Sequence, residues 1–108
     1  MVVCAWDKGH TWNFTSQQEM HNFFQGYICR KPERLEHPTQ KPLNIMKHLI
    51  KISSKPGDII LDCFAGTATV GIAALLMKRR YFLVENNSEY FKIASNRLER
   101  AKKRLGLF

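Results

Sequence analysis

The stretch that decides the fold reads Ile59-Ile60-Leu61-Asp62-Cys63-Phe64-Ala65-Gly66-Thr67-Ala68-Thr69. Its first five residues form a short, continuous run with β-branched side chains, apolar except for Asp62, which predicts a strand buried on both faces, as in a parallel sheet. Small residues at 65–68 predict a tight loop. The apolar stripe that follows predicts a helix beginning near Ala68 or Thr69 and ending near the basic residues 78–80. The unit is therefore strand, loop and helix.

The flanking segments extend this unit into an α/β fold. Residues 81–85 predict a second buried strand, and residues 86–88 offer caps for a long helix with an apolar stripe from Phe91 to Leu105. Pro42 suits a first helical turn, and the spacing behind it predicts a helix over 42–53. The last helix also has a basic face, which we interpret as solvated in preference to DNA-binding: Lys92, Arg97, Arg100, Lys103 and Arg104. The predicted fold class is α/β and Rossmann-like, a partial parallel sheet with flanking helices.

The overall composition narrows the class of protein. A chain of 108 residues forms at most one small domain, and its net charge of +8 favours a polyanionic partner such as nucleic acid. No stretch approaches the ~20 apolar residues of a membrane helix, and the N-terminus does not resemble a secretory signal, so we expect a cytoplasmic protein. Three scattered cysteines predict neither a disulfide framework nor a zinc site.

The loop after the first strand has the features of a nucleotide-type site. Gly66 permits close approach of a ligand to the backbone, and the start of the next helix directs free N–H groups at the loop, where a ligand carboxylate would be stabilised. Glu85 follows at close to the ~20 residues at which an acid accepts hydrogen bonds from ribose hydroxyls. Ala68 occupies the second glycine position of G-x-G-x-x-G, and its methyl crowds a pyrophosphate. The ligand is therefore expected to lack one, unlike NAD or FAD.

A second motif lies before this loop in the sequence. The hexapeptide His37-Pro38-Thr39-Gln40-Lys41-Pro42, taken with residues 62–69, resembles the paired signatures of bacterial and phage DNA N6-adenine and N4-cytosine methyltransferases. The resemblance covers about residues 30–104 and is to the class whose cofactor half follows the catalytic half. It implies the S-adenosylmethionine-dependent methyltransferase fold, S-adenosyl-L-methionine as cofactor, DNA as partner, and a role in restriction-modification.

The resemblance also implies which residues bind the cofactor. The hexapeptide lies beside the methionine end, the loop surrounds the ligand, and Glu85 holds the ribose. Asp62 either orders the loop or meets the ammonium group, and Phe64 either packs near the adenine or fills the core. No metal is expected at His37, because no second ligand stands at suitable spacing. The expected cofactor-binding residues are His37, Thr39, Lys41, Pro42, Asp62, Phe64, Ala65, Gly66, Thr67, Thr69, Glu85 and Asn86.

The sequence departs from the family at three points. Cys63 and Ala68 stand where the family usually has proline and glycine, and the sequence contains no Pro-Pro pair. The family's Asp/Asn/Ser-Pro-Pro-aromatic tetrapeptide binds the target amine and the flipped base. We therefore assign no catalytic residue and expect the chain to begin too late to include that motif. Residues 1–36 are expected to be a remnant of the catalytic and target-recognition half, and 37–108 the S-adenosylmethionine-binding part.

Three functions compete at this point. The leading hypothesis is the S-adenosylmethionine-binding part of an enzyme that methylates the exocyclic amine of adenine (N6) or cytosine (N4) in DNA. The alternative is a non-catalytic cofactor- or DNA-binding subunit, or a degenerate fragment, of a split methyltransferase. A dinucleotide-dependent oxidoreductase is disfavoured by Ala68 and the hexapeptide. Under either of the first two hypotheses we expect exposed sheet edges and apolar surface, and a protein partner or missing half that carries the catalytic motif.

Overall fold

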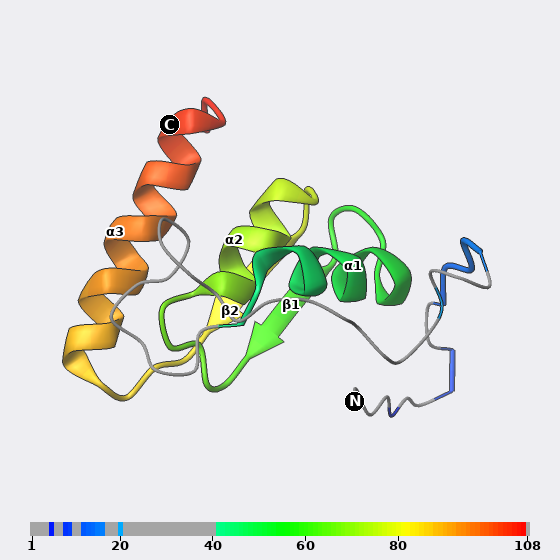
Figure 1. Cartoon of the computed structure of the whole chain (residues 1–108), viewed down its shortest axis with the longest axis horizontal. Helices are drawn as coiled ribbons and strands as arrows, with labels where there is room; N and C mark the ends of the chain where they lie inside the picture. The colour runs from blue at the N-terminus through cyan, green and yellow to red at the C-terminus, as the bar shows by residue number, and fades with distance from the viewer. Residues whose placement is uncertain (1–4, 6–7, 10–11, 17–19, 21–40, 108) are drawn as a thin grey trace.

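The computed structural model describes residues 5, 8–9, 12–16, 20 and 41–107. Its elements are α1 (Leu43–Ser53), β1 (Ile59–Asp62), α2 (Thr69–Leu76), β2 (Arg80–Leu83) and α3 (Ser88–Arg104). The two strands pair in parallel, and α2 connects them, so the predicted α/β class is confirmed (Figure 1). Within this part of the chain no helix is long and apolar enough to cross a membrane.

The predicted elements differ from the observed ones mainly at their ends. Pro42 is the N-cap of α1 and stands just before its first residue. The strand β2 ends at Leu83, so Glu85 lies in the connection to α3. Backbone pairing continues past the strands, because Val84 N donates to Asp62 O at 2.9 Å and Ala65 N donates to Val84 O at 2.9 Å. These bonds hold the two strand exits side by side.

Small residues on α2 allow close packing between the layers. Ala73 and Ala74 are fully buried and form the centre of the core with Ile50 of α1. Gly71 faces β2 and α3: a Cβ atom there would lie 2.6 Å from Leu83 Cδ1, which is closer than real Cβ atoms approach a neighbour. Gly71 therefore leaves room for the Leu83 side chain between α2 and β2.

One face of the sheet is uncovered in the part of the chain described. Leu61 is 62% exposed and Phe82 is 63% exposed, and Ile59 is exposed beside them. The prediction that both strands are buried on both faces is therefore wrong for the described residues. Exposed and partly buried residues alternate along each strand because α2 packs only against the face that carries Ile60 and Tyr81. The expectation of exposed apolar surface is confirmed for these residues.

A buried arginine joins α1 to the start of β2. Arg79 is 7% exposed, and its guanidinium donates three hydrogen bonds: Nε to Ser54 Oγ at 3.0 Å, Nη2 to Ser54 O at 2.6 Å and Nη1 to Met77 O at 2.6 Å. Ser54 Oγ in turn donates to Ile50 O at 2.6 Å. The guanidinium thus satisfies carbonyl groups where two elements end, which offsets the cost of burying its charge.

Asn13 brings the N-terminal part of the chain to the end of α1. Its backbone N–H donates to Ile52 O at 2.7 Å, and its side-chain amide donates to Lys51 O at 2.9 Å and to Ser54 O at 2.7 Å. The last carbonyl groups of a helix lack intrahelical partners. Asn13 supplies partners at this helix end.

The buried arginine yields a stability prediction. Arg79→Met removes three donors. It takes the guanidinium bonds from Met77 O and Ser54 Oγ, while Ser54 O keeps its bond from Asn13, so the free energy of unfolding in urea should fall by about 2 kcal/mol. The matched control is Arg80→Met, because Arg80 is exposed and donates one surface hydrogen bond to Gly57 O. That variant should lose under about 1 kcal/mol. Equal losses for the two variants would contradict the proposed clamp.

Candidate functional site

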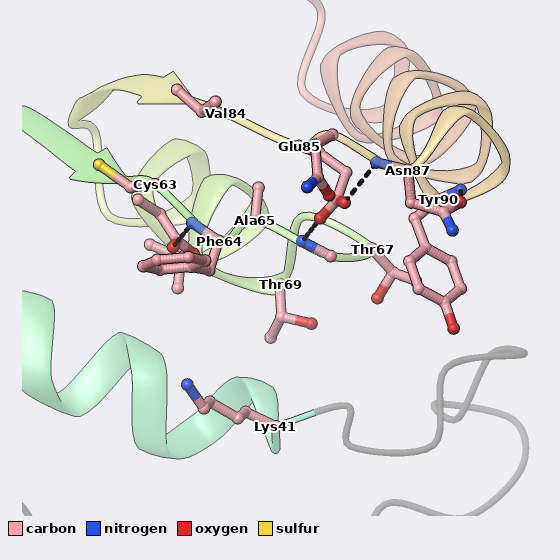
Figure 2. Close-up of a pocket in the computed structure, with 14 residues that line it drawn as sticks. Lys41, Cys63, Phe64, Ala65, Thr67, Thr69, Val84, Glu85, Asn87 and Tyr90 are labelled. Atoms are coloured by element: carbon pink, nitrogen blue, oxygen red, sulfur yellow. Dashed lines mark hydrogen bonds between the residues drawn. The ribbon is translucent and has the colours of Figure 1, made fainter.

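A cleft of about 650 Å³ opens at the carboxyl ends of β1 and β2 (Figure 2). Ligands of open α/β sheets bind at this edge, because the loops leaving the strands converge there. The first turn of α3 and a residue just before α1 complete the walls. The lining residues are Lys41, Asp62, Cys63, Phe64, Ala65, Gly66, Thr67, Thr69, Val70, Val84, Glu85, Asn86, Asn87 and Tyr90.

The Glu85 carboxylate joins the two loops of the cleft. Gly66 N donates to Glu85 Oε2 at 2.7 Å, and Asn87 N donates to Glu85 Oε1 at 2.8 Å, as the dashed lines in Figure 2 show. The side chain is half-buried. Each carboxylate oxygen accepts one of these bonds, and Glu85 also lines the cleft. The bridge therefore both closes the loop and presents an acceptor to the cleft.

Asp62 and Phe64 form the exit from β1. Phe64 N donates to Asp62 Oδ1 at 2.9 Å, which bends the chain into the loop. The Phe64 side chain is 91% exposed and lies on the wall of the cleft. Of the two roles left open for Phe64, filling the core is therefore wrong for the described structure. The bond from Phe64 N shows that Asp62 orders the loop.

The start of α2 is built from an unusual backbone conformation. Ala68, its N-cap, has φ 65° and ψ 32° in the left-handed region, and its side chain is fully buried. Only glycine adopts this region without a steric penalty. The helix follows at once with Thr69, so its first N–H groups face the loop, as predicted.

Arg97 of α3 holds this loop in place. Its Nη1 donates to Thr67 O at 3.2 Å and to Thr69 Oγ1 at 2.9 Å. The side chain is half-buried, so the interpretation of Arg97 as part of a solvated basic face is wrong. Lys92, Arg100, Lys103 and Arg104, from the same predicted face, are exposed. The helix α3 packs beside α2, which lets one arginine of this face reach the loop.

Asn87 caps α3 and brings Tyr90 into the cleft. Its Oδ1 accepts from Glu89 N and from Tyr90 N, both at 3.0 Å. The cap was predicted, whereas its effect on Tyr90 was missed. A residue three positions after an N-cap lies in the first helical turn beside the cap, which is the signal that could have identified it.

Most of the sequence-predicted residues come together around the cleft. Those that line it are Lys41, Asp62, Phe64, Ala65, Gly66, Thr67, Thr69, Glu85 and Asn86. Pro42 caps α1 and is not among the lining residues. His37 and Thr39 lie outside the described residues. The lining residues that the prediction did not include are Cys63, Val70, Val84, Asn87 and Tyr90. Among the residues that the structure places, no group of three or more His, Cys, Asp or Glu could hold a metal ion.

Comparison with known proteins identifies relatives. A family model for DNA methylases, of the N6/N4 methyltransferase group, matches residues 5–96. The chain is 38% identical over 91 residues to the DNA adenine methyltransferase YhdJ of Escherichia coli, covering 84% of this chain and 28% of that protein. It is 39% identical over 84 residues to the type II methyltransferase M2.DpnII of Streptococcus pneumoniae, covering 76% and 31%. The chain thus spans less than a third of either relative.

Solved structures are also similar to this chain. The complex of M1.HpyAVI with S-adenosylmethionine (SAM) superposes with a TM-score of 0.67 at 34% identity, over 82% of this chain and 44% of that chain. The structure of TTHA0409 from Thermus thermophilus, complexed with S-adenosyl-L-methionine, gives a TM-score of 0.54 at 40% identity. That match covers 56% of this chain and 25% of the other.

The strained helix start gives a second stability prediction. Ala68→Gly should raise the free energy of unfolding by up to about 1 kcal/mol, because relief of the left-handed conformation (about 1–2 kcal/mol) exceeds the loss of one buried methyl (about 0.8 kcal/mol). Ala73→Gly is the control, since Ala73 is equally buried inside α2. It should lower stability by about 1 kcal/mol or more. Destabilisation by both substitutions in urea melts would contradict the account of Ala68.

Proposed function

The chain belongs to the DNA methylase family, and from this membership we propose that its cleft binds S-adenosyl-L-methionine. The observation that supports this most strongly is the Glu85 bridge: an acid after the second strand and a glycine loop after the first meet at 2.7 Å. That arrangement suits a ligand with a ribose. The relatives solved as complexes with S-adenosylmethionine support the identity of the ligand.

Each end of the proposed ligand has suitable partners. Glu85 accepts from the ribose hydroxyls, with Asn86 beside it. The first N–H groups of α2 and the Lys41 ammonium attract the methionine carboxylate, and Asp62 attracts its ammonium group. Phe64 and Tyr90 offer aromatic surface for the adenine. The proposed site also contains Ala65, Gly66, Thr67 and Thr69 of the loop, and His37, Thr39 and Pro42 of the hexapeptide.

The proposed reaction is methyl transfer to an exocyclic amine of DNA, N6 of adenine or N4 of cytosine. The cofactor, when bound, would supply a methyl group activated by its sulfonium, with S-adenosylhomocysteine as the leaving group and the amine proton released to solvent. This chain's residues contribute by fixing the position of the donor. The Glu85 bridge and the loop tied by Arg97 give that position before ligand arrives.

Target binding is proposed to come from other polypeptide. The 108 residues contain no Pro-Pro pair, and the matches cover only 28% and 31% of the two relatives. We propose that residues 37–108 form the cofactor part and 1–36 belong to the catalytic half. A polypeptide bearing the tetrapeptide then covers the apolar face of Leu61 and Phe82. We propose that the complete enzyme acts on DNA in the cytoplasm as part of a restriction-modification system.

One observation favours a second candidate. Because the 108 residues contain no Pro-Pro pair, the chain also fits a non-catalytic cofactor- or DNA-binding subunit, or a degenerate fragment, of a split methyltransferase. Both candidates include the cofactor site. They differ in whether methyl transfer follows when the catalytic half is supplied.

Calorimetric titration with S-adenosylmethionine tests the cofactor site. Glu85→Ala should weaken binding by about 10- to 100-fold, because it removes the ribose acceptor and the bond to Gly66 N. Glu99→Ala is the control, since Glu99 is an exposed acid on α3 away from the cleft. It should bind like wild type. Failure of the wild-type chain to bind at millimolar ligand rejects the proposal for this chain.

A methylation assay separates the two candidates. The chain alone should transfer no tritiated methyl to unmethylated DNA. Transfer should begin when a catalytic segment of a relative, with its Pro-Pro tetrapeptide, is added. Glu85→Ala should abolish the restored activity in this assay. Binding of the cofactor without activity in the presence of the added segment would favour the non-catalytic subunit, and activity of the chain alone would contradict the proposed division of labour.

A further inference from the structure

Arg97 acts on the cleft without belonging to its wall. Its guanidinium extends from α3 to Thr67 O and Thr69 Oγ1, and both of these threonines line the cleft whereas Arg97 does not. The two bonds span the left-handed Ala68, which lies between the threonines. The arginine therefore fixes the loop across its most strained residue.

The bond to Thr69 sets the polarity of the threonine hydroxyl. A guanidinium has donors only, so Thr69 Oγ1 must accept, and its own proton is directed elsewhere. Thr69 is almost fully buried except toward the cleft, and Figure 2 shows its side chain projecting from the loop toward the side that carries Lys41. The hydroxyl proton is therefore available to an acceptor group of a ligand, such as a carboxylate oxygen. Accepting from a cation also strengthens the hydroxyl as a donor.

The charge of Arg97 acts in the same direction. The start of a helix carries a partial positive charge from its free N–H groups, and a guanidinium within hydrogen-bond distance of Thr69, the first residue of α2, adds to it. Lys41 contributes a further cation to the same cleft, while Glu85 and Asp62 place their carboxylates at the two strand exits. The start of α2 thus combines helix N–H groups with the Arg97 guanidinium, and Lys41 lines the same cleft.

We propose that Arg97 is a positioning residue that makes the start of α2 select ligands bearing a carboxylate, through the oriented Thr69 hydroxyl and its own charge. This inference rests on the proposed function, because it assigns the methionine carboxylate of the ligand to that place. Arg97 itself does not touch the ligand.

The test compares two ligands that differ in the aminocarboxypropyl group, which carries the carboxylate. S-adenosylhomocysteine has the aminocarboxypropyl group, and 5′-methylthioadenosine has a methyl in its place. In calorimetry, Arg97→Met should weaken S-adenosylhomocysteine about 10-fold and 5′-methylthioadenosine less than about 3-fold. Arg97→Lys keeps the charge and should recover part of the loss. Arg100→Met, an exposed arginine on the same helix, should leave both affinities unchanged.

A second variant separates ligand selection from folding. Thr69→Val removes the hydroxyl but leaves the bond from Arg97 to Thr67 O, so it should produce the same selective loss. The double variant should lose less than the sum of the two, because both remove one interaction. Equal weakening of the two ligands in Arg97→Met and Thr69→Val, or no weakening, overturns the inference. Failure of wild type to bind either ligand instead rejects the cofactor site itself.

Discussion

Parallel pairing of β1 with β2 is the constraint on which the site depends. Asp62 lies opposite Leu83, so both strands leave the sheet at the same edge. A parallel pair cannot be closed by a hairpin, and the crossover through α2 is what returns the chain to that edge. Gly66 and Glu85, 19 residues apart in sequence, consequently meet at 2.7 Å. The cleft therefore forms because the parallel register places both strand ends at one edge of the sheet.

The parts of this arrangement that the sequence predicts are those encoded locally. Apolar runs mark the strands, small residues at 65–68 mark the loop, and the spacing from Gly66 to Glu85 follows from one strand-helix-strand unit. Arg97 and Arg79 were not predicted to contact the loop and the core, because a basic side chain on a helix face or at a helix end usually lies in water. The packing of α3 and of α1 against α2 brings the Thr69 and Ser54 acceptors within their reach.

The sheet shows a different limit of sequence reading. Leu61 and Phe82 lie in apolar strands of the kind that are usually covered on both faces. The described residues cover only the face of the sheet opposite these two side chains. An apolar side chain indicates that a residue is suited to burial. It gives no information on which polypeptide buries it. The family relatives, of which this chain spans less than a third, are consistent with the proposal that further polypeptide covers this face.

The central claim is that the edge formed by the two strand exits is the binding site for S-adenosylmethionine. Residue-resolved ¹H–¹⁵N spectra of the chain during titration with the cofactor test it most directly. We expect the largest shifts at the amides of Gly66, Thr67 and Asn87, with those of Gly57 and Gly106, away from the cleft, unchanged. Shifts that cluster elsewhere, or no shifts at millimolar cofactor, would contradict the claim.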